Sequence, residues 1–316
     1  MLSTYIDNHY LKTCIYNASG CLCSNSSELE ELLYSSTGAV LTKSSTILPR
    51  NGNILPRYFA NDIGSINSMG IPNNGYQYYY QYYNINKNRY DKPFIQSIYP
   101  FDIKELSVMF DDIIKNCDTS NYMIELNLSC PNVNKKTIIG YDYEMLDSYF
   151  DYLKNNQTHK KFTIGIKLPP YYLNYDFDMT SNILLKYSGT INYITCINSV
   201  INGLIVDINS ETAVISPNNG LGGIGGSYCL PTGLSNVYQF YNRLDKKINI
   251  IGCGGVNSGI NVFEYILCGA NAVQIGTQLC REGPNCFNRI NKELEKIMID
   301  KKYSNIIDFM GCLKII

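Results

Sequence analysis

Several residue types are rare or missing in this chain of 316 residues, and each absence excludes a class of protein. Tryptophan is absent and only two histidines occur, His9 and His159, so the commonest general base and zinc ligand is scarce. No apolar run reaches the ~18 residues that a membrane span needs. The 26 Lys and Arg against 27 Asp and Glu give a net charge of -1, which excludes the basic surface of a nucleic-acid-binding protein.

Twelve cysteines are spread along the chain without the spacing of a metal site. Cys21 and Cys23 form a lone C-x-C pair, and no two C-x-x-C units occur. Residues 1–14 lack the basic and apolar regions of a secretion signal, which predicts a cytoplasmic protein. Thiols in that compartment stay reduced, so we expect neither a bound metal nor disulfides.

Short segments rich in Val, Ile and aromatic residues alternate with helical patterns along most of the chain. The expected strands are Ile15–Ser19, Ala39–Lys43, Pro93–Ile98, Tyr122–Leu128, Phe162–Leu168, Tyr193–Ile197, Ile248–Gly252 and Ala272–Ile275. The expected helices are Ser26–Ser36, Ile103–Asn116, Tyr143–Asn155, Asp178–Lys186, Thr232–Leu244, Ser258–Cys268 and Pro284–Ile299. This alternation predicts an α/β fold, namely a (β/α)8 TIM barrel formed by residues 1–316 as a single domain.

Two stretches interrupt the alternation. Residues 46–76 are rich in Pro, Gly and Asn, and residues 200–231 combine a hairpin pattern with a glycine run at 220–226. Both stretches follow the ends of expected strands. Because barrel active sites are built from the loops that follow the strands, we expect these insertions at the C-terminal face of the barrel.

Glycines follow the last two expected strands. Gly254 and Gly255 come after the seventh strand, and Gly276 and Thr277 come after the eighth. In many barrels these two ends hold a phosphate, because glycine lets the backbone approach the anion and a helix N-terminus faces it. Tight turns alone are the alternative explanation, and two such ends in succession favour the phosphate.

Cys130 lies just beyond the fourth expected strand, in the segment NLSCPN. A cysteine is most often a small buried apolar residue. At the mouth of a barrel, however, a thiolate can act as a base if its surroundings lower its pKa. With so few histidines in the chain, Cys130 is the best candidate for a general base.

Two lysines occupy matching strand ends, Lys43 in TKSS and Lys167 in IKLP. A buried ammonium group is unfavourable unless it has a partner. A structural ion pair is one explanation. The functional alternatives are an anion clamp, a positive charge beside a flavin, or a Schiff-base nucleophile. Two lysines at matching strand ends favour a functional role, and the sequence leaves open which of the three it is.

Side-chain amides and a hydroxyl are frequent at the same expected face of the barrel. They are Asn67, Asn127, Asn132, Asn198 and Ser199. Each amide offers a donor and an acceptor, which suits a ring that carries imide N–H and C=O groups. The group predicts recognition of a planar, amide-like heterocycle.

The motifs TKSST, NGNILPRY, GSINSMGIPN, ELNLSCPNV, GIKLPPY, INSVINGL, GLGGIGG, GCGG and IGTQL occur in that order and span nearly the whole chain. Together they resemble class 1A dihydroorotate dehydrogenases. The resemblance implies a cytosolic homodimer of FMN-containing barrels that oxidises (S)-dihydroorotate to orotate in pyrimidine synthesis. It also implies that fumarate reoxidises the flavin.

The resemblance further implies a role for each matching residue. Cys130 would be the general base. Lys43, Asn67, Met69, Gly70, Ile71, Asn127, Asn132, Asn198 and Ser199 would bind the substrate. Ala18, Ser19, Lys43, Ser44, Asn127, Lys167, Ile197 and Gly226 would bind FMN, and Gly254, Gly255, Gly276 and Thr277 would bind its phosphate.

Three segments depart from the family pattern. Tyr99-Pro100 replaces smaller residues, Asn134–Lys136 replaces a Pro/Gly-rich lid, and the turn at residues 216–219 lacks lysines that relatives can carry. Three alternatives stay open. One is a class 1B-like enzyme that passes electrons to a partner protein, and another is a phosphosugar lyase or isomerase with a Schiff-base lysine. The third is a flavin-binding protein that has lost catalysis.

Overall fold

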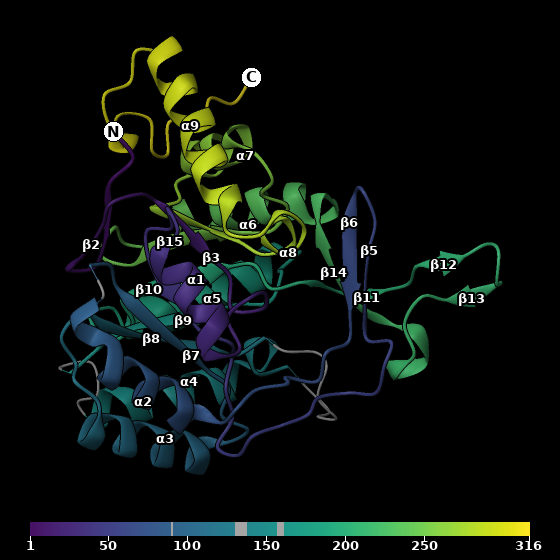
Figure 1. Ribbon diagram of the computed structural model, residues 1–316. Helices are drawn as coiled ribbons and strands as arrows, with labels where there is room; N and C mark the ends of the chain where they lie inside the picture. Colours follow the sequence, from purple (N-terminus) through teal and green to yellow (C-terminus); the bar gives the residue numbers. More distant parts are fainter. Residues whose placement is uncertain (90, 130–137, 157–160) are drawn as a thin grey trace.

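The computed structural model describes residues 1–89, 91–129, 138–156 and 161–316. Within these ranges, eight parallel strands form one sheet (Figure 1). In chain order they are β3 (Ile15–Asn17), β4 (Val40–Leu41), β7 (Phe94–Ile98), β8 (Tyr122–Asn127), β9 (Thr163–Lys167), β10 (Tyr193–Cys196), β15 (Asn249–Cys253) and β16 (Ala272–Ile275). From β4 to β16 each strand pairs with the next one in this order, and β16 pairs with β3, so only β3 and β4 are neighbours that do not pair strand to strand among the described residues. All eight were expected from the sequence.

A side chain completes the circle between β3 and β4. Asn17 donates from Nδ2 to the Leu41 carbonyl (2.6 Å), and the Leu41 N–H donates to Asn17 Oδ1 (2.9 Å). Asn17 is fully buried, so the amide must find such partners inside the protein. The sheet is therefore a nearly closed barrel, as the sequence predicts.

Helices surround this sheet. They are α1 (Ser26–Tyr34), α2 (Tyr76–Asn86), α3 (Ile103–Asn116), α4 (Tyr143–Asn155), α5 (Asn174–Lys186), α6 (Leu230–Tyr241), α7 (Gly259–Leu267), α8 (Thr277–Glu282) and α9 (Asn285–Asp300). Two were not expected. In α2 the buried tyrosines Tyr76, Tyr79, Tyr80 and Tyr83 recur at helical spacing, although tyrosine itself favours strands. The other, α8, is a short helix directly after β16.

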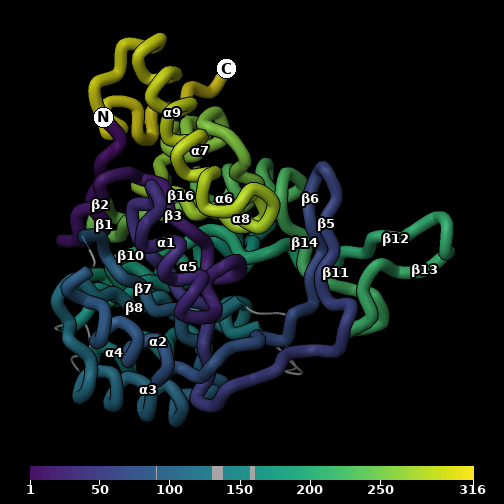
Figure 2. Tube along the Cα trace, in the orientation of Figure 1, coloured from purple at the N-terminus to yellow at the C-terminus, as the bar shows by residue number. Residues whose placement is uncertain are grey.

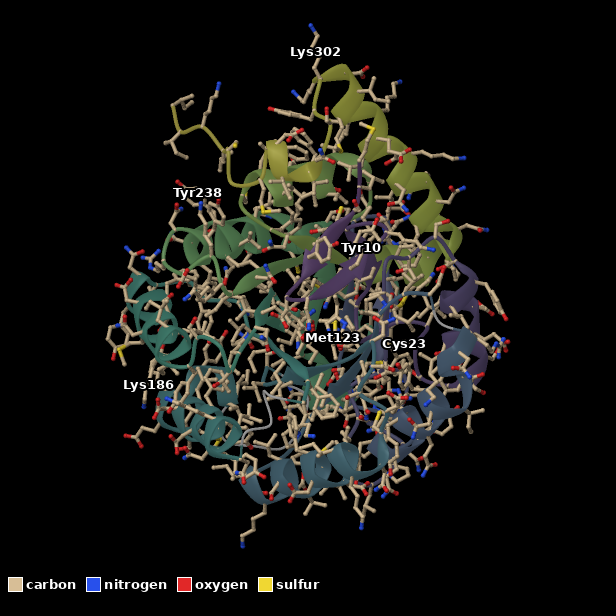
Figure 3. All side chains as sticks on the ribbon, turned by 90° about the vertical axis from the view of Figure 1, so that its left-hand side faces the viewer. Tyr10, Cys23, Met123, Lys186, Tyr238 and Lys302 are labelled. Carbon is tan, nitrogen blue, oxygen red and sulfur yellow. A yellow bond between two sulfur atoms is a disulfide. The ribbon has the colours of Figure 1, made fainter. Side chains whose placement is uncertain are left out.

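The core lies inside the barrel and between the barrel and its helices. In Figure 3, Met123 of β8 lies centrally among the strands, whereas Lys186 and Lys302 lie at the periphery. Leu106, Phe110 and Ile113 of α3 are fully buried, and each recurs three or four residues after the last, which is the spacing that puts them on one helix face. No helix among the described residues is long and apolar enough to cross a membrane.

The two insertions build a second, four-stranded sheet beside the barrel (Figure 2). Its strands are β5 (Tyr58–Ala60), β6 (Gly64–Asn67), β11 (Val200–Gly203) and β14 (Gly222–Gly226). The expected hairpin is β12 (Val206–Asp207) with β13 (Thr212–Ala213), and it projects away from the barrel. Another small hairpin, β1 (Thr4–Ile6) with β2 (His9–Leu11), precedes the barrel.

The glycine run belongs to β14, in the middle of this second sheet. β14 lies between β11 and β6. A Cβ at Gly223 would collide with the Ser199 hydroxyl, and one at Gly222 would approach the Asn67 carbonyl to 2.6 Å. Glycine is therefore needed here for close packing of β14 against β6 and against Ser199, which follows β10.

Candidate active site

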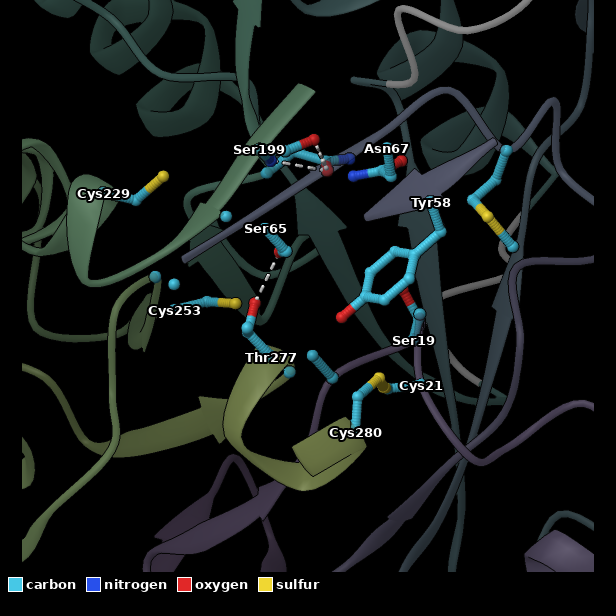
Figure 4. A pocket seen from close by; sticks show the side chains of 18 of the residues that line it. Ser19, Cys21, Tyr58, Ser65, Asn67, Ser199, Cys229, Cys253, Thr277 and Cys280 are labelled. Atoms are coloured by element: carbon cyan, nitrogen blue, oxygen red, sulfur yellow. Dashed lines mark hydrogen bonds between the residues drawn. A yellow bond between two sulfur atoms is a disulfide. The ribbon is translucent and has the colours of Figure 1, made fainter. Parts of the chain in front are cut away.

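A cavity of about 710 Å³ opens where the carboxyl ends of the barrel strands meet the four-stranded sheet. Barrel strands β8, β9, β15 and β16 contribute one side, and β5, β6 and β14 contribute the other. Figure 4 shows Tyr58 and Asn67 of the sheet and Cys253 and Thr277 of the barrel around the same space. The volume lies within the usual range for small-molecule and cofactor sites.

Nearly all the described residues that the sequence predicted for the site line this cavity. They are Ala18, Ser19, Lys43, Ser44, Asn67, Met69, Ile71, Asn127, Lys167, Ile197, Asn198, Ser199, Gly226, Gly254, Gly255, Gly276 and Thr277. Gly70 is not among the lining residues, and its φ of +69° shapes the turn between Met69 and Ile71. Cys130 and Asn132, together with the predicted lid residues Asn134–Lys136, lie outside the described residues. The structure brings the lining residues together, while their roles stay predictions.

A network of two amides and two hydroxyls forms one wall of the cavity. Asn127, the last residue of β8, donates from Nδ2 to Ser44 Oγ (3.0 Å). Its Oδ1 accepts hydrogen bonds from Asn198 Nδ2 (3.2 Å) and Ser129 Oγ (3.0 Å). Asn198 Nδ2 also donates to Ser129 Oγ (2.7 Å). These bonds fix the orientation of both amides, and so decide which donors and acceptors they offer to a ligand.

Asn67 reaches the cavity from the second sheet. It ends β6, and its Nδ2 donates to the Gly223 carbonyl (3.2 Å) of β14. The sequence placed this residue in an insertion at the C-terminal face of the barrel, and the structure shows that this insertion forms a strand of a separate sheet. The amide nevertheless lines the same cavity, because the insertion folds back over the strand ends.

Both predicted lysines are buried at the cavity, Lys43 with 7% of its surface exposed and Lys167 with 4%. Lys43 Nζ lies 3.5 Å from the Gly20 carbonyl. Lys167 Nζ donates to Gln274 Oε1 (2.7 Å) and Cys253 Sγ (3.1 Å). Two buried ammonium groups make this cavity suitable for an anionic ligand.

The predicted phosphate residues lie at one end of the cavity. Gly254 and Gly255 have φ values of +124° and +78°, in the region that favours glycine. Among the described residues, a Cβ at Gly276 would have only the Ala18 Cβ within 4 Å, at 3.6 Å, so they leave space beside this backbone. Thr277 begins α8, and its Oγ1 lies 3.0 Å from Ser65 Oγ of β6. This end of the cavity can accept a group that approaches the backbone closely.

Sequence reasoning missed several residues that line the cavity, among them Arg57, Tyr58, Ser65, Cys253 and Gln274. Arg57 donates from Nη1 to the carbonyls of Asn51 (2.5 Å) and Asn53 (2.9 Å) and so shapes the first insertion. Gln274 could have been predicted from the sequence, because a glutamine inside an apolar strand needs polar partners in the core. No pattern in the sequence marked Tyr58 or Ser65, because only the folding of the insertion brings them to the barrel.

One expectation about the cysteines is wrong. Cys21 and Cys280 are joined by a disulfide at the cavity wall (Figure 4), with their Cα atoms 5.8 Å apart. The two cysteines are 259 residues apart in the sequence, so no local spacing indicated that they pair. Cys21 follows β3 and Cys280 lies in α8 after β16, and these two strands are neighbours in the barrel.

Cys229, which also lines the cavity, is a free thiol, and burial raises its pKa to about 11. It is therefore protonated at neutral pH and is a poor base.

Comparisons with known proteins give consistent results. Residues 1–298 match the sequence profile of the family described as Dihydroorotate dehydrogenase. The chain is 45% identical to dihydroorotate dehydrogenase A (fumarate) of Lactococcus lactis subsp. lactis, over 99% of each chain. It is 44% identical to dihydroorotate dehydrogenase (fumarate) of Kluyveromyces lactis, over 97% of this chain and 96% of the other.

The fold also matches a solved structure, DHODH from Eimeria tenella in complex with ferulenol. The TM-score is 0.80 at 17% identity, with coverage of 98% of this chain and 88% of the other. At this identity the match supports the barrel fold alone. The full-length sequence matches carry the assignment: the chain belongs to the dihydroorotate dehydrogenase family, in its class 1A.

Proposed function

We propose that this protein oxidises (S)-dihydroorotate to orotate in pyrimidine biosynthesis, with FMN as its cofactor and fumarate as the electron acceptor. One observation carries the proposal. In a chain that is 45% identical over 99% of its length to a fumarate-type enzyme, one cavity brings together two buried lysines, an amide network and two glycine-containing strand ends. A planar anionic ligand and a phosphorylated cofactor need these features.

The residues of the cavity fit FMN. The open space beside Gly276 and the glycine backbone at Gly254 and Gly255 suit the phosphate. Ala18, Ser19, Lys43, Ser44, Asn127, Lys167, Ile197 and Gly226 would hold the rest of the cofactor. When bound, FMN supplies the two-electron chemistry by accepting a hydride from the substrate. The ammonium of Lys167 would favour the anionic, reduced form of the cofactor by electrostatic attraction.

The amide network would bind the substrate ring. Asn67, Asn127, Asn198 and Ser199 present donors and acceptors to the cavity, and each amide is held by the protein before a ligand arrives. Such preorganisation reduces the entropy lost on binding. Lys43, with the backbone of Met69, Gly70 and Ile71, would neutralise and surround the substrate carboxylate. The same positive group would bind the carboxylates of fumarate in the oxidative half-reaction.

Cys130 would remove the proton from the substrate carbon next to the one that loses hydride, and Asn132 would help to hold the ring. Both residues lie outside the described ranges. Ser129 directly precedes Cys130 in the chain. Asn127 holds it at the cavity wall by accepting hydrogen bonds from its backbone N–H (3.3 Å) and its hydroxyl (3.0 Å), which supports the proposal. We also infer that the chain acts as one domain, as a cytoplasmic homodimer.

The test follows both half-reactions in one cuvette. The purified protein, reconstituted with FMN, should be yellow, should bleach anaerobically with dihydroorotate and should regain its colour with fumarate. Cys130→Ala should slow bleaching by about 10²–10⁴-fold, the usual contribution of a general base. Cys312→Ala, at an exposed cysteine near the C-terminus, is the matched control and should bleach at the wild-type rate.

The same experiment separates the alternatives. A protein that stays colourless after reconstitution with FMN would contradict the proposal. Bleaching without recovery in fumarate, but with recovery through a partner protein and NAD, would indicate the class 1B-like enzyme. A Schiff-base enzyme would be trapped covalently by borohydride with a carbonyl substrate. A flavin protein without catalysis would bind FMN and never bleach.

A further inference from the structure

A carboxylate lies in the barrel interior, below the cavity and outside the set of residues that line it. Glu125 belongs to β8 and is fully buried. Its Oε2 accepts hydrogen bonds from Thr195 Oγ1 (2.8 Å) and Gln274 Nε2 (2.8 Å). Its Oε1 has no hydrogen-bond partner among the described residues. A buried carboxyl with an unused oxygen is unfavourable for stability, so it calls for an explanation beyond packing.

The Gln274 side chain connects this carboxyl to the cavity. Its Oε1 accepts from Lys167 Nζ (2.7 Å), while its Nε2 donates to Glu125 and to the Tyr16 hydroxyl (3.3 Å). Only this orientation places the amide oxygen against the ammonium and the amide N–H against the carboxylate. A flipped amide would oppose like partners at both ends. Glu125 therefore fixes the orientation of the Gln274 amide, and the Gln274 oxygen in turn orients the ammonium of Lys167.

Lys167 is the cation that this arrangement connects to Glu125. Among the described residues, the Glu125 charge also acts on the phenols of Tyr16 and Tyr193. Burial, with this charge as a further cause, raises the pKa of both phenols well above its ordinary value. Both phenols are therefore neutral at physiological pH. None of the salt bridges among the described residues includes either Glu125 or Lys167. The two charges are thus related through a single bridging amide.

We propose that Glu125 is a positioning residue that balances the charge of Lys167 through Gln274 and so limits how strongly the site favours reduced flavin. The proposal rests on the proposed function, because Lys167 must face the flavin. Without a counter-charge, a buried ammonium beside the cofactor would stabilise the anionic reduced form strongly. A negative charge behind the lysine weakens that preference and leaves the reduced flavin able to pass its electrons to the acceptor.

The decisive variant is Glu125→Gln, which keeps the shape and an acceptor oxygen for both donors but removes the charge. We expect reduced FMN to bind at least tenfold more tightly relative to oxidised FMN. For a two-electron couple, tenfold corresponds to a rise of about 30 mV in midpoint potential. Thr195→Val is the matched control, because it removes a hydrogen bond to the same carboxylate without changing any charge. We expect its potential to stay within a few mV of the wild type.

The midpoint potential would be measured by slow anaerobic reduction of the reconstituted proteins beside a reference dye, and apoprotein stability by urea unfolding. If Glu125→Gln does not fold, the double variant Glu125→Leu with Thr195→Val replaces the carboxyl and its donor by apolar groups and should raise the potential similarly. A folded charge-free variant with an unshifted potential would overturn the inference, as would an equal shift in Thr195→Val. Wild-type protein that never binds FMN would instead refute the proposed function.

Discussion

Replacing Asn127 by alanine separates the contribution of the cavity wall to folding from its contribution to ligand binding. The side chain is buried and makes hydrogen bonds to Ser44, Ser129 and Asn198. After truncation, Ser44 keeps Ser97 as a partner (2.8 Å) and Asn198 keeps the Ser129 hydroxyl, but the buried Ser129 N–H loses its acceptor at 3.3 Å. An unsatisfied buried group costs ~1–3 kcal/mol and each lost bond about 1 kcal/mol. We expect Asn127→Ala to lower the free energy of unfolding by about 2–4 kcal/mol.

Asn236 offers a matched control. It is equally buried but lies in α6, away from the cavity. Its Oδ1 accepts from the Tyr171 N–H (2.8 Å), and its Nδ2 donates to the carbonyls of Tyr171 (3.0 Å) and Thr232 (3.0 Å). Asn236→Ala therefore loses a similar set of bonds and should be destabilised by a similar ~2–4 kcal/mol.

The two variants should differ in ligand binding. Loss of one or two hydrogen bonds to the ring should weaken orotate binding to the Asn127→Ala holoprotein by about 10- to 100-fold. The Asn236→Ala holoprotein should bind orotate within twofold of the wild type. Urea unfolding of the apoproteins and flavin absorbance titration with orotate measure the two effects. Equal losses of orotate affinity in both variants, or unchanged affinity in Asn127→Ala, would refute the assignment of this wall to the substrate.

Three further predictions concern the edges of the site. Lys167→Met should retain the fold but lose at least tenfold in affinity for reduced FMN, measured by flavin titration, because its buried ammonium is gone. The hydrogen bond from Arg289 lowers the pKa of Glu282 at the end of α8. The ion pair therefore stabilises the fold fully above the pKa of glutamate in the unfolded chain, ~4.3, and this stabilisation is lost as the pH falls through the lower pKa of the folded protein. Glu282→Gln should then lower the unfolding free energy by about 0.5 kcal/mol at pH 7, with little difference near pH 3 in urea titrations. Peptide mapping without reductant should find Cys21 linked to Cys280, and free alkylation of both thiols would contradict the disulfide.

The barrel could be predicted from local sequence because its signals are local. Segments such as Ala272–Ile275 are short, apolar and bounded by polar or glycine residues, and the structure contains that strand with the same bounds. Helix α2 could not be predicted in this way, because its tyrosines favour strands in isolation and only packing against the barrel selects the helix. Helix α1 begins at Ser26, as expected, and its N-cap is Asn25, whose Oδ1 accepts from the Glu28 N–H (3.0 Å).

By itself, the sequence determined which residues stand at the carboxyl ends of the barrel strands, and parallel strands bring such ends together at one face. Only the tertiary structure determined which residues from other segments contact these strand ends. The second sheet brings Asn67 and Tyr58 over the barrel, and barrel closure joins Cys21 to Cys280. Lys167 meets Gln274 across 107 residues of sequence, and Gln274 meets Glu125 across 149. Contacts over such separations have no local pattern, because only the closed barrel places the three side chains in one interior.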